Sequence, residues 1–426
     1  MKTTELKKAL ATGGLDGRLS EIYGAQALAG QKMRYLRAVE EFEALYGRDR
    51  EAALYSVAGR SELSGNHTDH NHGCVVAASI DLDIIAVASA SAGSVIRVKS
   101  EGFPEDAVDF DAYSAPDPAR YEKSASLIAG MVAGFRKEGL QVGGFDAYTT
   151  SNVLKGSGIS SSAAFEDMIG NILNYEYNGG RISNVEIAKL AQYAENRFFG
   201  KPCGLMDQMA CAVGGIIAID FRDPAAPVIE KTDFDLSAAG YNLCIVNTGG
   251  NHADLTGDYA SVPAEMKSVA AYFGREVLRD VDEQAVIDAI PALREKVGDR
   301  AILRALHFFA ENRRVAAQKQ ALQAGDLDTF LANVIASGRS SFCYLQNVYT
   351  TKNVAEQGLS LALCLAERVL SGKRAAWRVH GGGFAGTIQA FVPAEAVPEF
   401  RAVMDAAFGE GRCMVLRVRP EGALRV

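Results

Sequence analysis

A glycine- and serine-rich stretch, KGSGISSSAAFEDM from Lys155 to Met168, holds the residues best suited to bind a phosphate group. Gly156 and Gly158 permit backbone conformations that a Cβ would obstruct, and the three serines at 160–162 suit the first turn of a helix. Free N–H groups and the positive end of the helix dipole would then converge on one point, which favours an anion. A serine hydroxyl in that turn can also reach a metal ion on the phosphates. A plain loop before a helix cap would have the same composition, and the stretch is not a Walker A motif, because no Lys-Ser or Lys-Thr follows the second glycine.

Two carboxylates frame a second candidate stretch, ENRFFGKPCGLMDQ. Glu195 stands where a helical pattern ends, and Asp207 follows beyond the helix-breaking residues Pro202 and Gly204. Carboxylates on either side of such a turn can serve as a metal ligand and a base. They can equally cap helices, so this stretch alone leaves both interpretations open.

A third stretch, GNHTDHNHG at residues 65–73, is polar and turn-forming, and it follows a short apolar run that ends at Arg60. Its side chains with the most chemistry are His67, Asp69, His70 and His72. Zinc is one interpretation, since imidazole and carboxylate ligands can converge from a turn, although no Cys joins them and no HExxH is present. Hydrogen-bond recognition of a polyol is favoured over a metal site, and a solvated turn is the simplest alternative.

Glycines dominate a fourth stretch, HGGGFAG, which formally matches GxGxxG through Gly381, Gly383 and Gly386. A dinucleotide fingerprint should follow a strand and open a helix near the start of a βαβ unit. This stretch lies near the C-terminus and is followed by an apolar, strand-like run. We therefore interpret it as close packing of backbone against another element.

The elements that must position these residues indicate an α+β fold. Residues 1–47 have helix-like apolar spacing, and apolar strands precede Arg60 and the serine-rich stretch. We expect a strand, a break and a second strand over residues 74–90, with residues 94–100 as a hairpin partner. The C-terminal part holds long amphipathic helices and ends in strand, glycine turn, strand, helix and strand.

The domain boundary is expected to be soft, because no low-complexity linker and no repeat of fixed period interrupts the chain. We place it near residues 225–240 and predict an N-terminal domain of residues 1–235 and a C-terminal domain of residues 236–426. A chain of 426 residues is long enough for two such domains, each with its own core.

Composition narrows the class of protein. Hydrophobic residues make up 48% of the chain and charged residues 23%, as in soluble globular proteins. The net charge of −8, without a basic cluster, disfavours nucleic acid as a partner. No signal-peptide core or membrane-length apolar run is present, and the seven cysteines never occur in CxxC spacing. We expect a reduced cytoplasmic protein that acts on small molecules; oligomeric state is not indicated.

Taken in order, the four stretches resemble the motifs of the GHMP small-molecule kinases, and within them the galactokinases. AGRSELSGNHTDHNHG is similar to the signature around PGRxNLxGEHTDY, and KGSGISSSAA is similar to the family's phosphate-binding motif. ENRFFGKPCGLMDQ is close to the form E–F–G–PCG–MDQ, and RVHGGGFAG is similar to RxTGGGFGG. FEALYG at residues 42–47 resembles the family's F-xxx-YG lead-in, so the resemblance covers most of the chain.

The resemblance implies the two-domain α+β GHMP fold, with the active site in the cleft between domains. It implies transfer of the γ-phosphoryl group of ATP to O1 of a sugar, with Mg²⁺ as cofactor. By motif position, Asp207 is the catalytic aspartate, and Arg60 is the arginine beside it and the transferring phosphate. The other implied positions are the magnesium ligands Ser162 and Glu195, the phosphate-loop residues Gly156, Ser157, Gly158, Ser160, Ser161 and Ser162, and the sugar-binding residues Asn66, His67, Asp69 and Tyr259.

The chain departs from the galactokinase pattern at the sugar signature. Asn66 replaces the glutamate of GEHTDY, which in galactokinases recognises the 6-hydroxyl, and Glu62 replaces the asparagine of PGRxNL. Galactose is the first expectation, and a sugar with another C6 group, galacturonate or a 6-deoxy sugar, is the alternative, because an amide can donate to a carboxylate. On this basis Asn66→Glu should preserve or improve galactose phosphorylation and suppress activity on galacturonate. A non-catalytic sugar-binding regulator is a third possibility, disfavoured by the retained Asp207 and Ser162.

Overall fold

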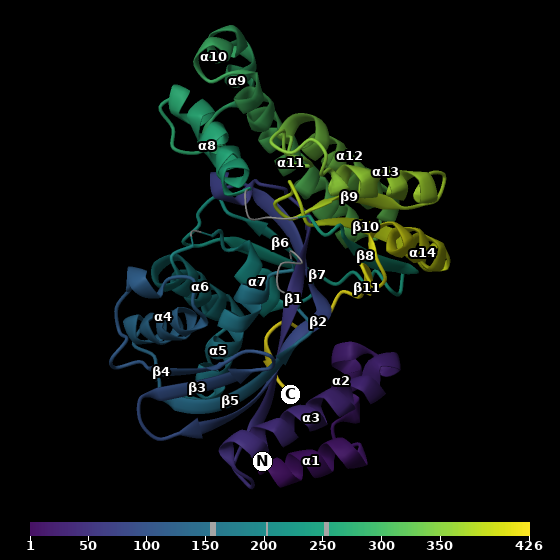
Figure 1. Ribbon diagram of the computed structural model, residues 1–426. Coiled ribbons are helices and arrows are strands. Elements are labelled where there is room, and N and C mark those ends of the chain that lie inside the picture. Colours follow the sequence, from purple (N-terminus) through teal and green to yellow (C-terminus); the bar gives the residue numbers. More distant parts are fainter. Residues whose placement is uncertain (154–158, 202, 251–254) are drawn as a thin grey trace.

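The computed structural model, which describes residues 1–153, 159–201, 203–250 and 255–426, contains two sheets with helices on their faces (Figure 1). The first sheet has eight strands in the order β12-β1-β2-β5-β3-β4, with β6 paired to β2 and β7 to β6. Its strands are β1 (Ala53–Ser64), β2 (Cys74–Ser91), β3 (Val95–Ser100), β4 (Glu105–Asp109), β5 (Gly144–Ser151), β6 (Ile216–Asp220), β7 (Val228–Thr232) and β12 (Leu424–Arg425). All pairs are antiparallel except β3 with β5.

Both faces of the first sheet are buried. On β1, Leu54 packs among the N-terminal helices, whereas Tyr55 and Val57 point into the larger core on the opposite face. The N-terminal helices are α1 (Thr3–Thr12), α2 (Asp16–Tyr23) and α3 (Leu28–Tyr46), and the opposite face carries α4 (Ser124–Lys137), α5 (Ser161–Tyr177), α6 (Asn184–Ala194) and α7 (Met206–Val213) (Figure 1). Burial on both faces explains why these strands are apolar along nearly their whole length.

The second sheet has four antiparallel strands in the order β11-β8-β10-β9. These are β8 (Tyr241–Asn247), β9 (Ala376–His380), β10 (Thr387–Pro393) and β11 (Cys413–Leu416). Val246 and Ile388 face α13 (Gly358–Leu370) and α14 (Val397–Phe408) on one side, and Ile245 and Phe391 face α11 (Asp299–Ala324) and α12 (Leu327–Ser340) on the other. A separate apolar cluster joins α11 to α8 (Thr256–Tyr272), α9 (Glu283–Asp288) and α10 (Ile290–Lys296).

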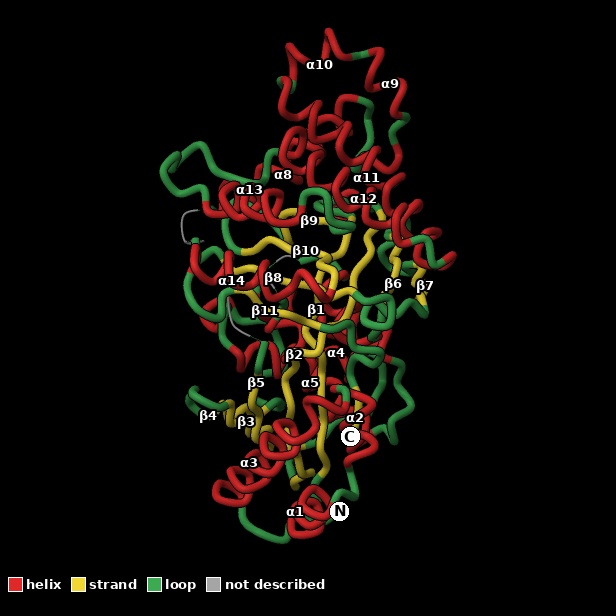
Figure 2. Tube along the Cα trace, turned by 90° about the vertical axis from the view of Figure 1, so that its right-hand side faces the viewer, coloured by secondary structure: helices red, strands yellow, loops and turns green. Residues whose placement is uncertain are grey.

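The α+β fold expected from the sequence is confirmed, and the chain passes from the first sheet to the second between β7 and β8. The end of the chain returns, however, because β12 pairs with β1, and both termini lie at the same end of the molecule (Figures 1 and 2). The buried Arg419, just before β12, is 3.1 Å from the Asp83 carboxylate on β2. The last residues therefore belong structurally to the first sheet.

Two local expectations are wrong. The break expected within residues 74–90 is absent, because β2 is one strand of 18 residues that runs far along the molecule (Figure 2). Its Asp83 does not interrupt the strand, since Arg34 and Arg419 pair with that carboxylate. The hairpin expected between β2 and β3 does not form either, because β5 occupies that edge of β2 and β3 pairs with β4 and β5.

No helix of the described part of the chain is long and apolar enough to cross a membrane.

Candidate active site

The helix predicted after the serine-rich stretch is α5, which begins at Ser161, whereas Gly156, Ser157 and Gly158 lie outside the described residues. Ser160 precedes the helix in the left-handed conformation, with φ of 59°. Its hydroxyl donates a hydrogen bond to Oδ2 of Asp207. The N-terminus of α5 is thus joined directly to the candidate base.

Asp207 and Arg60 form a two-pronged ion pair. Nε of Arg60 lies 2.8 Å from Oδ1 of Asp207, and a terminal nitrogen lies 2.9 Å from Oδ2. Arg60 comes from β1 and Asp207 from the first turn of α7, a short helix that the glycine and proline before it concealed in the sequence. The Arg60 side chain is 8% exposed and that of Asp207 34%, so the carboxylate is the accessible member.

The charge state of Asp207 follows from this pairing. Burial raises the pKa of the carboxyl group, but the charge and hydrogen bonds of Arg60, with the bond from Ser160, outweigh burial and hold the pKa below its usual value. Asp207 is therefore an anion at neutral pH that can accept a hydrogen bond or a proton from a hydroxyl group.

The two residues implied as magnesium ligands are adjacent. Oγ of Ser162, in the first turn of α5, lies 3.3 Å from Oε1 of Glu195. Glu195 begins the π-helical segment η4 (Glu195–Phe199), a rare local form that often occurs at functional sites. Two residues that the sequence did not single out complete the group: Lys201 Nζ is 3.0 Å from Oε1 of Glu195, and Gln208 Nε2 donates to Oε2 at 2.6 Å.

These groups suit a cation between protein and phosphate. Hydroxyl and carboxylate oxygens are ligands that Mg²⁺ accepts, and Mg²⁺ commonly takes one or two protein ligands while phosphates and water complete the octahedron. Among the described residues no group of three or more His, Cys, Asp or Glu side chains is arranged to hold a metal ion. A site with Ser162 and Glu195 as its protein ligands is of the two-ligand kind.

The polar turn at residues 65–73 is fixed by α11, a helix of the C-terminal half. Glu311 accepts the backbone N–H of Gly65 at 3.0 Å, and Asn312 accepts the N–H of Cys74 at 2.7 Å. His307 donates from Nε2 to the carbonyl oxygen of Asn66 at 3.0 Å. These three residues could not be predicted from the sequence, because an amphipathic helix does not reveal which polar side chains contact a distant turn.

The histidines of the turn form a directed chain of hydrogen bonds. Nε2 of His67 donates to the carbonyl oxygen of Gly382 at 2.9 Å, which leaves Nδ1 to accept from Nε2 of His70 at 3.3 Å. Asn71 in turn donates to Nδ1 of His70 at 3.0 Å. Burial lowers the pKa of both imidazoles, as neutral rings in such a chain require. Both ring nitrogens of His67 are therefore engaged by protein groups.

Asp69 has no side-chain hydrogen-bond donor among the residues described. Its carboxylate lies against Gly204, where a Cβ would overlap it, so the turn and the segment before α7 pack closely. Burial raises the pKa of Asp69 to about 6, and the charges of Glu62 and Asp207 add to the shift. The negative charges of Glu62 and Asp207 thus both act on the Asp69 carboxylate.

Asn66 does not have the surroundings we expected of a residue that contacts substrate. Its side chain is buried, and Nδ2 donates to Oε1 of Glu62 at 3.0 Å and to the carbonyl oxygen of Gly381 at 2.7 Å. Oδ1 accepts from Oγ of Ser341 at 3.2 Å and Nδ2 of Asn347 at 2.8 Å. Both donors and both acceptors of the amide are thus used within the protein.

The glycine-rich turn connects β9 and β10, which are antiparallel neighbours, so the dinucleotide interpretation lacks its βαβ unit. A Cβ on Gly383 would overlap the carbonyl oxygen of Asn347, and one on Gly382 would meet the Tyr259 ring at 2.7 Å, which supports the close-packing interpretation. Tyr259, in the first turns of α8, donates to the carbonyl oxygen of Gly383 at 2.8 Å. The structure thus brings Tyr259 to the turn that also contacts Asn66 and His67.

Comparison with known proteins agrees with this arrangement. A family model described as the GHMP kinases N terminal domain matches residues 126–215, and the galactokinase galactose-binding signature matches residues 40–90. A galactokinase from Streptomyces coelicolor is 31% identical over 384 residues, which cover 89% of this chain and 94% of the relative. A galactokinase from Actinobacillus pleuropneumoniae serotype 3 is 32% identical over 371 residues, covering 86% and 92%.

The chain belongs to the galactokinase family. Among solved structures, that of Lactococcus lactis galactokinase complexed with galactose matches with a TM-score of 0.77 and 24% identity, covering 92% of this chain and all of the other. At that identity the match establishes the fold, and the fold is that of the GHMP kinases, as the four motifs implied. Membership in the family makes this chain a kinase that uses ATP.

Proposed function

We propose that this protein is a galactokinase that transfers the γ-phosphoryl group of ATP to O1 of galactose, with Mg²⁺ as cofactor. The observation that carries the proposal is the constellation of Asp207, Arg60 and Ser160 at the N-terminus of α5. The anionic carboxylate there contacts Ser160 at a helix N-terminus that favours phosphate, and it follows shortly after Gly204, which packs against the Asp69 carboxylate. The names of the relatives supply the sugar, galactose.

Phosphoryl transfer is mostly a matter of positioning and electrostatics. In the proposed reaction Asp207 accepts the hydrogen of the sugar O1 hydroxyl and orients that oxygen toward the terminal phosphate. Arg60 keeps Asp207 ionised and places a positive charge beside the transferring group. The first N–H groups of α5 provide further positive potential for the phosphate oxygens.

Ser162 and Glu195 are the residues that would hold Mg²⁺, which neutralises phosphate charge when bound. Lys201, which is 60% exposed and pairs with Glu195, adds a positive charge on the same side. The positively charged and hydroxyl groups of the site thus gather at Asp207 and Glu195, where a triphosphate requires them.

The test is an ATP-turnover assay over a panel of neutral hexoses, uronates and 6-deoxy sugars, with the product identified by ³¹P NMR. Turnover with galactose, and a phosphorus signal coupled to the anomeric proton, is the expected result. Turnover with another sugar and none with galactose would overturn the choice of substrate. Sugar binding without ATP turnover would mean that the protein is a sugar-binding regulator.

A further inference from the structure

Glu62 and Asn66 hold, in reversed order, the two residue types that the galactokinase signature has at these positions. The pattern PGRxNLxGEHTDY places an amide first and a carboxylate four residues later, whereas this chain reads AGRSELSGNHTDH. The two side chains touch here, with Nδ2 of Asn66 donating to Oε1 of Glu62 at 3.0 Å. Two groups in direct contact can exchange types and leave the same pair, one carboxylate and one amide, at the same place.

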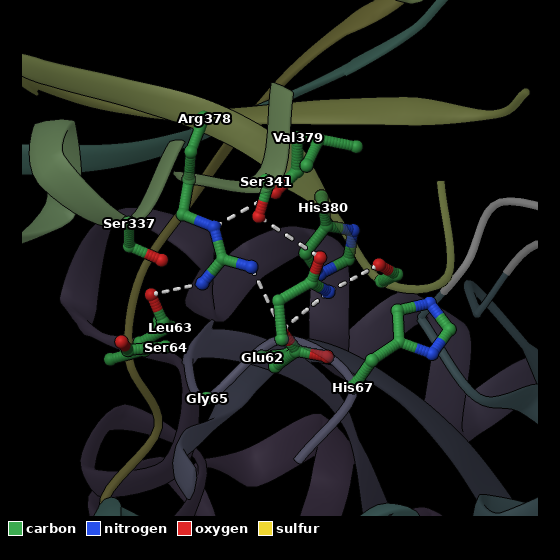
Figure 3. Close-up of polar contacts among 12 residues, drawn as sticks. Glu62, Leu63, Ser64, Gly65, His67, Ser337, Ser341, Arg378, Val379 and His380 are labelled. Carbon is green, nitrogen blue, oxygen red and sulfur yellow. Dashed lines mark hydrogen bonds and ion pairs between the residues drawn. The ribbon is translucent and has the colours of Figure 1, made fainter. Parts of the chain in front are cut away.

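The carboxylate of Glu62 is held from one side by a buried cation. The Arg378 side chain on β9 is fully buried, and its guanidinium lies 2.9 Å from Oε1 of Glu62 while also donating to the carbonyl oxygens of Leu63 and Val379 (Figure 3). A buried charge without a partner is strongly unfavourable. Glu62 is the one carboxylate paired with Arg378 in the described part of the chain, so the buried cation needs a carboxylate from the Glu62–Asn66 pair beside it.

The second oxygen of Glu62 remains available. Asn66 and Arg378 both contact Oε1, and no described residue donates a hydrogen bond to Oε2. Figure 3 shows Glu62 between Arg378 and His67. The charge of Glu62 also acts on His67, Asp69 and Arg60, so the carboxylate lies among the residues of the candidate active site although the residue is only 5% exposed.

We propose that Glu62 supplies the carboxylate that accepts a hydrogen bond from a hydroxyl group of the sugar, and that Asn66 is its positioning residue. This inference rests on the proposed function. It replaces our expectation for Asn66, whose amide has no group left for a ligand. With His67 also engaged on both nitrogens, Glu62 and Asp69 are the described carboxylates of this turn region whose oxygens are left to accept from a sugar, in addition to Asp207 at O1.

Two carboxylates suit a neutral sugar and oppose an acidic one. A hexose presents hydroxyl donors, which a carboxylate binds with charge-assisted hydrogen bonds. A uronate would bring a third negative charge into a site where Glu62 already raises the pKa of Asp69. Specificity at this position is therefore expected to select a hydroxyl group and reject a carboxylate, contrary to the galacturonate alternative that the Asn66 substitution suggested.

The decisive experiment exchanges the two residues in the full-length protein. The variants are Glu62→Asn, Asn66→Glu and the double variant E62N/N66E, assayed with galactose and galacturonate at saturating ATP. Each single variant should raise KM for galactose about ten- to a hundredfold with a smaller change in kcat, because the first removes a charged acceptor and the second places two carboxylates together. The double variant restores one carboxylate and one amide, and its KM should return to within about fivefold of the wild-type value.

A matched control is Glu311→Gln, which alters another buried carboxylate at the same turn whose oxygens accept from Gly65, Ser337 and Arg314. It should lower thermal stability without changing the preference for galactose over galacturonate, whereas Glu62→Asn should reduce that preference. If Glu62→Asn does not fold because Arg378 loses its partner, the double variant decides, since it keeps the charge.

A double variant no better than the worse single variant, or a Glu62→Asn protein with an unchanged KM, would overturn the inference. Should the wild type use a sugar other than galactose, the proposed function fails. The same variants then test Glu62 with the sugar that is used.

Discussion

The phosphate side and the sugar side of the site satisfy their carboxylates differently. On the phosphate side, Asp207 is paired with Arg60 and Glu195 with Lys201, and each also receives a serine hydroxyl. On the sugar side, one oxygen of Glu62 is bound by Arg378 and Asn66, and Asp69 has no cationic partner among the residues described. Positive charge is thus placed where a triphosphate would bind, and carboxylate oxygens that no described side chain donates to lie where a neutral polyol would bind.

The two sides also differ in how far their motifs keep the residue types of the family. The phosphate side retains the serine, glutamate, aspartate and arginine of the motifs, whereas the sugar side exchanges Glu62 and Asn66. A transferring phosphoryl group imposes the same charge distribution on every member of a kinase family. Sugar recognition depends on the number and placement of hydrogen-bond acceptors, which can be met by the same groups in another order.

The largest effect is expected on the phosphate side, from Asp207→Asn. Asn is nearly isosteric and can still contact Arg60, so the protein should fold, but loss of the anionic acceptor should lower kcat roughly 10²–10⁴-fold. Turnover and circular dichroism measured on the same preparation would check both statements.

Asp220→Asn is the matched control, because Asp220 pairs with Arg279 at 2.7 Å and is 36% exposed, against 34% for Asp207. It should keep turnover near the wild-type value. A folded Asp207→Asn protein with turnover as high as that of the control would mean that the Arg60–Asp207 pair is structural.

The second effect is expected on the stability of the protein, from loss of the ion pair between Arg378 and Glu62 on the sugar side. Arg378→Met leaves Glu62 buried without its cation, and removal of one partner of a buried pair commonly costs about 3–5 kcal/mol of unfolding free energy. Urea denaturation would measure it. Arg374→Met, which removes an exposed pair with Asp328, should leave the denaturation midpoint unchanged. Equal midpoints for both variants would show that Glu62 does not depend on Arg378.

The phosphate side of the site could be predicted from the sequence to a greater extent than the sugar side. The fold, the Ser162–Glu195 contact and the Arg60–Asp207 pair agree with what the resemblance of the four motifs to a kinase family implied, although each motif alone left alternatives open. The contacts among Glu62, Asn66 and Arg378 could not be predicted, because Glu62 and Arg378 are 316 residues apart and neither motif indicates that the other holds its partner. The contacts from α11 to the turn at residues 65–73 could not be predicted for the same reason. The pattern of a long helix does not show which of its polar residues contact a distant turn.

A third, smaller effect distinguishes two neighbouring serines. Ser162→Ala removes the hydroxyl next to Glu195 and should raise the Mg²⁺ concentration needed for half-maximal turnover, with little change in galactose binding. Ser160→Ala removes a hydroxyl that contacts Asp207 instead, and it should lower turnover without altering the Mg²⁺ requirement. Mg²⁺ titrations of the two variants would compare them, and identical titration curves would contradict the assignment of Ser162.

The smallest effect is a shift in the pH dependence of sugar binding. Burial, with the charges of Glu62 and Asp207, raises the pKa of Asp69 to about 6 from the usual 3.8, so galactose binding should weaken as acidification through about pH 6 protonates this acceptor. The pKa values of His67 and His70 are lowered by burial, which moves their titration below the usual 6.5.

The variant Glu62→Gln tests this assignment. It removes one of the two neighbouring negative charges but leaves burial and Asp207, so the pH midpoint of galactose binding should move to lower pH without reaching 3.8. Calorimetric titration with galactose in the absence of ATP avoids the titration of the nucleotide, and Asp69→Asn should abolish the midpoint altogether. A midpoint that stays at the same pH in Glu62→Gln would mean that the two carboxylates do not share the sugar side of the site.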